Sequence, residues 1–217
     1  MDYIREMLQL QDGFNEKTVP NWREKNLDWV NAIMLEASEQ NESLHSWKWW
    51  KNTNEKDDLA NFEVEVIDNW HFLMSLGMTV YSKSYLNDEY KLLWEETLYG
   101  NEINSLQEET QLFCYYTLGS KFSKFRSNYF KAVKSLFNIM ITLEIDSFEE
   151  LYKKYLIKNC LNGFRQDNGY KDGTYIKIWT GADGKKYEDN VIAWELTLPN
   201  DTIESLYFKL DLFYKNM

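Results

Sequence analysis

Two pairs of acidic residues have a spacing that could bind a divalent cation. Glu36 and Glu39 lie three residues apart in one expected helix, and Glu65 and Asp68 lie three residues apart in another. This spacing puts both carboxylates of a pair on the same helical face, about one turn apart. Many such pairs occur by chance in an acidic chain, and most of them lie on solvated faces. Whether these two pairs bind a metal therefore has to be judged from the residues around them.

Both pairs are expected in apolar surroundings. Glu36 continues a helical stripe that includes Ile33, and Glu65 and Asp68 interrupt a helix that is apolar nearly all round. Buried carboxylates are rare unless they are paired or bound to a metal. Four converging carboxylates would repel one another, and divalent cations are the usual compensation. A ligand set made only of oxygen atoms suits a hard ion, so the pattern predicts a Mg²⁺ site.

The residues that prefer softer metals do not form a pattern. His45 and His71 are isolated, and we expect structural roles for both. Cys114 and Cys160 are far apart and belong to no CxxC or Cys/His cluster, which argues against a disulfide framework and a zinc site.

Charge is unevenly distributed along the chain. Residues 36–68 contain nine acidic and three basic side chains, whereas residues 151–186 contain eight basic and three acidic ones. An acidic region that binds metal and a basic region that binds phosphate are what phosphoryl or nucleotidyl hydrolysis requires. Composition by itself equally allows the basic region to be a solvated helix end followed by a loop.

Composition also excludes several classes of protein. The net charge of −11 argues against non-specific nucleic-acid binding, which needs a basic face. The amino terminus carries charges throughout and lacks the apolar run of a signal peptide. No apolar stretch is long enough to span a bilayer. We therefore expect a cytoplasmic protein with no membrane or nucleic-acid partner.

The scarcity of Gly and Pro favours an all-α fold made of long helices. Apolar periodicity predicts helices at 3–15, about 25–45 and about 59–80, two or three more within 86–145 with breaks near Gly100 and Gly119–Ser120, and one from the capping box of Ser147 and Glu150 to about Gln166. Residues 167–190 contain four of the nine glycines, which predicts a long loop or a short hairpin. A last helix is expected after Pro199.

Three segments of the chain resemble the all-α dimeric dUTPases of certain bacteria, phages and trypanosomatids. The first is LQLQDGFN at 8–15, the second includes IMLEASEQ, SWKWWKN and EVEVIDNWHFLMSLG between 29 and 77, and the third is KNCLNGFRQDNGYKDGTYIKIWTGADGKKYEDN at 158–190. This combination of motifs is specific, although residues 80–150 match nothing recognisable.

The resemblance implies a fold, a reaction and an assembly. The fold is the multi-helix bundle of the all-α NTP pyrophosphatases, formed by a single domain over 1–217 with rigid catalytic helices in about 1–80 and 147–217 and a candidate mobile part at about 81–146. The reaction is hydrolysis of dUTP, and of dUDP, to dUMP, with two or three Mg²⁺ ions per site and a metal-held water as the attacking group. The assembly is a homodimer, encoded by a bacterium or a phage.

The resemblance also implies roles for individual residues. Glu36, Glu39, Glu65 and Asp68 would hold the metal ions, and Glu39 would also deprotonate the attacking water. The remaining roles are base reading by Gln11 and Asn15, packing on the base by Trp50, exclusion of a 2′-hydroxyl by Phe72, and phosphate binding by Lys158, Asn162, Arg165, Tyr170 and Lys177. Lys158, Asn162 and Arg165 have spacings that place them on one helical face.

The chain departs from the family pattern in places, and alternatives stay open. Gln40, Asn41 and Glu42 follow Glu39 where relatives have two apolar residues and an Asp, and extra residues precede Asp189 and Asn190. One alternative keeps the fold and changes the base, as in a dCTP pyrophosphatase or a broader MazG-like hydrolase. Another is a non-catalytic acidic protein that binds a protein partner or mimics DNA, and a third is a purely structural helical module. The orientation of the two amides, on which base choice depends, is not determined by the sequence.

Overall fold

The computed structural model describes residues 1–51, 55–100 and 104–217. It is predominantly helical, and the sheet among the described residues has two short strands, so the predicted all-α fold is confirmed. The chain divides into two compact units, Met1–Leu151 and Tyr152–Met217, which are described separately below. No helix of the described residues is long and apolar enough to cross a membrane.

The first unit is built from helices. It contains α1 (Tyr3–Thr18), the short 3₁₀ helix η1 (Trp22–Glu24), α2 (Trp29–Glu42), α3 (Leu59–Met78), α4 (Lys83–Leu98), α5 (Leu106–Phe122), α6 (Phe125–Thr142) and the first residues of α7 (Phe148–Asp167). The helices predicted at 3–15, 25–45 and 59–80 are all present. The second begins at Trp29 rather than near residue 25, because the Asp28 side chain accepts a hydrogen bond from the Asn31 backbone N–H and caps the helix there.

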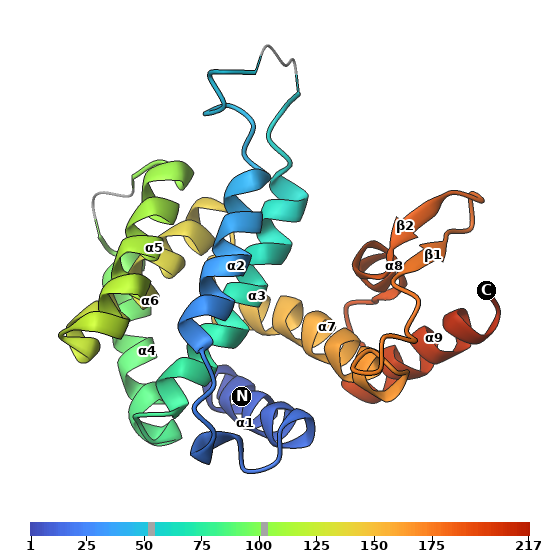
Figure 1. Ribbon diagram of the computed structural model, residues 1–217, viewed down its shortest axis with the longest axis horizontal. Coiled ribbons are helices and arrows are strands. Elements are labelled where there is room, and N and C mark those ends of the chain that lie inside the picture. Colours follow the sequence, from blue (N-terminus) through green and yellow to red (C-terminus); the bar gives the residue numbers. More distant parts are fainter. Residues whose placement is uncertain (52–54, 101–103) are drawn as a thin grey trace. The chain divides into compact units, whose positions relative to one another are not determined.

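Helix α3 is the central element of this unit. Its side chains are apolar nearly all round, and almost all of them from Val64 to Met78 are buried. It packs against α1, α2, α4 and α6, and it runs beside α2 (Figure 1). A helix that contacts several neighbours places its few polar side chains inside the protein, where each one needs a partner.

The middle of the chain forms three helices, within the predicted number. The break near Gly100 is present, but the second break lies at Ser123–Lys124 instead of Gly119–Ser120. Gly119 belongs to α5 because α5 and α6 approach closely there: a Cβ atom on Gly119 would lie 2.8 Å from Nδ2 of Asn128.

The second unit combines most of α7 with a hairpin and two helices. Strands β1 (Ile178–Thr180) and β2 (Lys186–Glu188) pair antiparallel, with Trp179 opposite Tyr187, and α8 (Asp189–Leu196) and α9 (Ile203–Lys215) follow (Figure 1). The hairpin and α9 were predicted, whereas α8 was not. The core of this unit consists of Ile157, Cys160, Leu161, Phe164, Trp179, Ile192, Ala193, Leu206 and Leu210.

Candidate functional site

Packing of α2 against α3 brings three of the predicted metal ligands together. Carboxylate oxygens of Glu36, Glu65 and Asp68 all lie within 4.8 Å of one another. Glu65 is 7% exposed and Asp68 9%, while Glu36 is half-buried, so the group borders the interior and still reaches solvent. Helix α2 supplies Glu36, and α3 supplies Glu65 and Asp68.

The donor atoms in this group suit a hard divalent cation. All three residues offer carboxylate oxygens, which are preferred ligands of Mg²⁺. Three carboxylates within such a distance repel one another, and a cation between them would reverse that repulsion. The residues present therefore fit a Mg²⁺ ion.

Glu39 is not part of this group. It lies one turn after Glu36 on α2, and its side chain is exposed. Among the carboxylates that the structure describes, the group that could share an ion is Glu36, Glu65 and Asp68. The role of Glu39 stays a prediction.

Neither histidine contributes to the group. Nδ1 of His71 lies 2.8 Å from the Ile67 carbonyl oxygen, one turn earlier in α3. His45 lies 3.3 Å from a Glu55 carboxylate oxygen. Within the described part of the chain, neither belongs to the group of carboxylates that could hold an ion.

The two predicted base-reading amides meet a serine of α3. Gln11 and Asn15 are buried on one face of α1, which packs against α3. Gln11 Nε2 donates to Asn15 Oδ1 at 3.0 Å and to Ser75 Oγ at 3.1 Å, and Asn15 Nδ2 donates to Ser75 Oγ at 2.9 Å. Sequence reasoning did not identify Ser75, because a serine in an apolar helix carries no signal of its own.

The two aromatic residues of the predicted nucleoside pocket differ in exposure. Phe72 is half-buried, and its ring centroid lies 6.2 Å from that of Trp29. Trp50 is 54% exposed and contacts Trp47 and Trp49 through edge-to-face ring pairs. An exposed tryptophan offers a flat apolar surface on which a base could stack.

In the second unit, Arg165, one of the predicted phosphate-binding residues of α7, forms a buried ion pair with Asp189. Arg165 donates from Nε to Asp189 Oδ2 at 2.8 Å and from Nη2 to Asp189 Oδ1 at 2.7 Å. Its third nitrogen, Nη1, donates to Asn162 Oδ1 at 3.2 Å. This bidentate arrangement sets the plane and the direction of the guanidinium.

Asp189, the partner of Arg165, was given no role in the sequence analysis. It is fully buried as the first residue of α8, and it also accepts a hydrogen bond from the Tyr175 hydroxyl at 2.7 Å. Burial, together with the charge of Asp189 and this hydrogen bond, strongly raises the pKa of Tyr175. Tyr175 therefore stays protonated and acts as a donor. The EDN sequence at 188–190 was a sequence signal for Asp189. It was not used because helix α8, which positions Asp189, was not predicted.

The other predicted phosphate-binding residues have varied surroundings. Lys158 is buried, and it lies on the α7 face that carries Asn162 and Arg165. Tyr170 is half-exposed, with the Arg165 guanidinium carbon 5.9 Å from its ring centroid. Lys177 is exposed and pairs with Glu188 across the start of the hairpin, at 3.2 Å.

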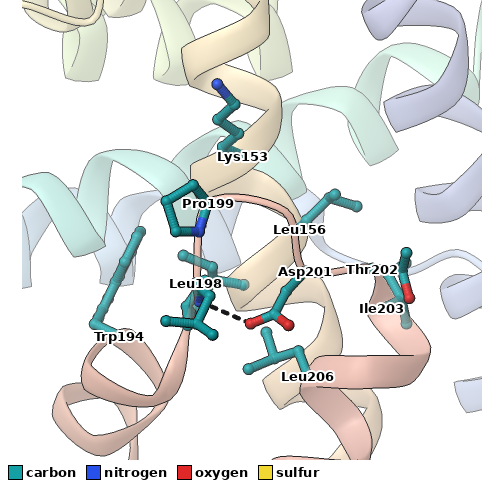
Figure 2. A pocket seen from close by; sticks show the side chains of 11 residues that line it. Lys153, Leu156, Trp194, Leu198, Pro199, Asp201, Thr202, Ile203 and Leu206 are labelled. Carbon is teal, nitrogen blue, oxygen red and sulfur yellow. Dashed lines mark hydrogen bonds between the residues drawn. The ribbon is translucent and has the colours of Figure 1, made fainter.

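A pocket of about 260 Å³ elsewhere in the second unit holds none of these residues. It lies between α7 and the segment around Pro199, and Figure 2 shows its mostly apolar lining, which includes Leu156, Trp194 and Leu206. Asp201 shapes one side by accepting a hydrogen bond from the Leu198 backbone N–H at 2.7 Å. This pocket is therefore distinct from the predicted phosphate-binding residues.

Comparison with known proteins bears on the same residues. The model of a family described as dUTPase matches residues 3–170, which is most of the chain. The match includes the carboxylates, the two amides and the predicted phosphate-binding residues up to Tyr170. No curated protein matches the chain. With the helical fold, the family match shows that the chain belongs to the all-α dUTPase family and is a dUTP diphosphatase.

Proposed function

We propose that this enzyme hydrolyses dUTP and dUDP to dUMP in a Mg²⁺-dependent reaction, with pyrophosphate as the second product from dUTP. The observation that carries the proposal is the meeting of Glu36, Glu65 and Asp68 within 4.8 Å. When bound, Mg²⁺ would neutralise phosphate oxygens and polarise the bond that breaks. The three carboxylates would hold the Mg²⁺ ion, because their oxygen atoms lie close enough together to share it.

Glu39 is proposed to accept the proton of the attacking water. It lies one turn from Glu36 on α2, and its exposed side chain can be reached by solvent. A carboxylate next to a cation site is a suitable general base when it contacts the water directly. Its position outside the group of three is consistent with separate roles for metal binding and proton transfer.

The nucleoside would be recognised by residues of the first unit. Gln11 and Asn15 supply hydrogen-bonding groups for the base, Trp50 a surface for stacking, and Phe72 the wall against the sugar. A half-buried aromatic ring cannot form a hydrogen bond with a 2′-hydroxyl, so a ribonucleotide would lose hydration there without compensation.

The phosphate chain would be bound by cationic and polar residues of the second unit. Lys158, Arg165 and Lys177 carry positive charge, and the neutral residues Asn162 and Tyr170 complete the set. The bidentate bonds from Arg165 to Asp189 hold the guanidinium in one orientation before substrate binds. An arginine held in this way loses little side-chain entropy on binding a phosphate oxygen through Nη1.

The first experiment is pyrophosphate or phosphate release from dUTP, dUDP, dCTP, dTTP and UTP, with Mg²⁺ and with EDTA. The proposal expects turnover of dUTP and dUDP that needs Mg²⁺. Equal cleavage of dCTP would keep the metal-dependent reaction and overturn the base preference. Turnover of dUTP that EDTA leaves unchanged would overturn the role given to Glu36, Glu65 and Asp68.

A second experiment tests Glu39. The Glu39→Gln variant should lose turnover by a factor on the order of a thousand, because a glutamine cannot accept the proton, while dUTP binding changes little. The matched control is Glu42→Gln, which removes an exposed carboxylate at the end of the same helix. If Glu39→Gln turns over dUTP at the parent rate, Glu39 is not the base.

We also propose a homodimer that uses the outer face of α5. Tyr115, Leu118 and Phe122 share one side of this helix and are 69%, 39% and 77% exposed, opposite the buried side with Phe113 and Thr117. An exposed apolar stripe of this kind is typical of a subunit interface. Light scattering should give twice the chain mass, and Phe122→Glu should give a monomer; a monomeric parent at micromolar concentration would overturn the proposal.

A further inference from the structure

The hydroxyl group of Ser75 lies at the centre of a buried hydrogen-bond network. Ser75 is completely buried in α3, and its Oγ has three neighbours: the His71 carbonyl oxygen at 2.9 Å, Gln11 Nε2 at 3.1 Å and Asn15 Nδ2 at 2.9 Å. A hydroxyl has one proton to donate and two lone pairs that accept. Three neighbours therefore use its full capacity.

The position of the hydroxyl proton follows from the chemistry of the neighbours. The carbonyl oxygen of His71 can only accept, so a short distance between it and Oγ requires the Ser75 proton between them. The lone pairs of Oγ then face both amides, and each amide has to present its nitrogen. If either amide were reversed, two oxygen atoms would meet with no proton between them, and this buried contact would be repulsive.

Ser75 therefore determines the orientation of both amides. Gln11 uses both of its N–H groups, one on Ser75 and one on Asn15 Oδ1, so its amide can offer a base only a carbonyl oxygen. Asn15 accepts through Oδ1 and donates one N–H to Ser75, so what its amide can offer a base is the second N–H. The pair presents one acceptor and one donor, in that order.

An acceptor followed by a donor is complementary to the imide group of uracil and not to the amidine group of cytosine. Uracil has an N3–H donor beside a C4 carbonyl acceptor, whereas cytosine has an N3 acceptor beside a C4 amino donor. An acceptor from Gln11 and a donor from Asn15 pair with uracil, and the same two groups face cytosine acceptor to acceptor and donor to donor. We propose that Ser75 is a positioning residue for base selection, which holds Gln11 and Asn15 in the orientation that favours dUTP over dCTP. This proposal rests on the proposed role of the two amides in reading the base.

The test is the ratio of kcat/KM for dUTP to kcat/KM for dCTP, measured on one preparation of each variant. Such a ratio does not depend on the fraction of folded enzyme. In Ser75→Ala the amides lose their common acceptor and can reverse, so the ratio should fall by about tenfold to a hundredfold, the cost of one mismatched buried hydrogen bond. Ser75→Thr keeps a hydroxyl that can bond to the His71 carbonyl, and it should restore most of the ratio.

Ser120→Ala is the matched control. Ser120 is a buried helical serine of α5 whose hydroxyl donates to the Thr117 carbonyl at 2.7 Å, and it contacts neither amide in the described hydrogen bonds. The substitution removes the same group from the same kind of place and should leave the ratio unchanged. If Ser75→Ala does not fold, Ser75→Cys replaces it, because a thiol of similar size accepts far more weakly and should also lower the ratio.

Gln11→Ala separates failure of this proposal from failure of the proposed function. If Gln11→Ala lowers the ratio and Ser75→Ala does not, base reading by Gln11 stands and the role of Ser75 is wrong. If neither variant changes the ratio, the amides do not read the base, and the proposal for Ser75 fails with that role. A parent enzyme that cleaves dCTP as efficiently as dUTP also overturns the role of Ser75.

Discussion

The two units of this protein differ in how their buried charges are compensated. In the first unit, Glu36, Glu65 and Asp68 bring charges of the same sign within 4.8 Å. In the second unit, the buried charge of Arg165 is matched by the buried carboxylate of Asp189 through two hydrogen bonds. A cluster of like charges gains stability from a bound ion, whereas an ion pair within the chain supplies its own compensation. The first unit should therefore depend on a ligand, and the second on its own side chains.

The largest expected effect is loss of a carboxylate from the first unit. Glu65→Gln should lower kcat for dUTP by a factor on the order of a thousand, because the proposed Mg²⁺ site loses its most buried carboxylate. It should also abolish the rise in Tm that Mg²⁺ gives the parent protein, since that rise reports binding to the folded state. Glu63→Gln, on the same helix and outside the group, is the control and should keep both properties.

Removing Asp189 should destabilise the second unit itself, rather than abolish a response to Mg²⁺. Asp189→Asn leaves the Arg165 charge buried without its partner, so the free energy of unfolding should fall by about 3 kcal/mol, as measured by urea denaturation. Substrate KM should rise as well, because Asp189 orients Arg165. Glu188→Gln breaks only the exposed pair with Lys177 and should change neither quantity measurably. Equal stability of Asp189→Asn and parent would remove the contrast between the units.

Asp12 shows that the first unit also contains a compensated carboxylate. Partial burial raises the pKa of Asp12, but hydrogen bonds from Arg23, Lys83 and Trp22 outweigh this effect and lower it to about 2. A lowered pKa means that the stabilisation is present above the unfolded value of 3.8 and is lost as pH falls towards 2.

The Asp12→Asn variant should therefore lose about 2 kcal/mol of stability at pH 7, and the difference from the parent should shrink as pH falls from 4 to about 2. Asp28→Asn is the control, because Asp28 pairs with Lys121 at the surface and asparagine can still cap α2. A loss in Asp12→Asn that is independent of pH would show that packing, rather than charge, is responsible.

The smallest expected effect concerns the sugar. Phe72→Ala should raise the relative kcat/KM for UTP against dUTP by about tenfold, because removing the ring makes room for a hydrated 2′-hydroxyl. Trp29→Leu is informative beside it, since it removes the ring that contacts Phe72 while keeping an apolar side chain. No change in relative UTP turnover would exclude Phe72 from the sugar pocket.

Much of the fold could be read from local pattern. The helices α1, α2, α3 and α7 follow from apolar periodicity and from their capping residues, since both are properties of neighbours in sequence. Helix α8 was missed because eight residues rarely form a stable helix by themselves, and Ile192 and Ala193 are helical in the context of the core that buries them. The break between α5 and α6 was misplaced because a glycine was taken as a helix end, whereas it marks a close helix contact.

The sequence by itself determined the class of the protein: the spacing of the acidic residues, the amide pair and the motifs of α7 lie within single helices or short segments. Tertiary structure decided which of these residues meet. It joined Glu36 to Glu65 and Asp68 and left Glu39 outside, and it placed Asp189 on Arg165. It also placed Ser75 between two amides that are more than 55 residues away in sequence. Hydrogen-bond direction depends on all the partners of an atom at once, so base selection could be inferred only after helices α1 and α3 were packed together.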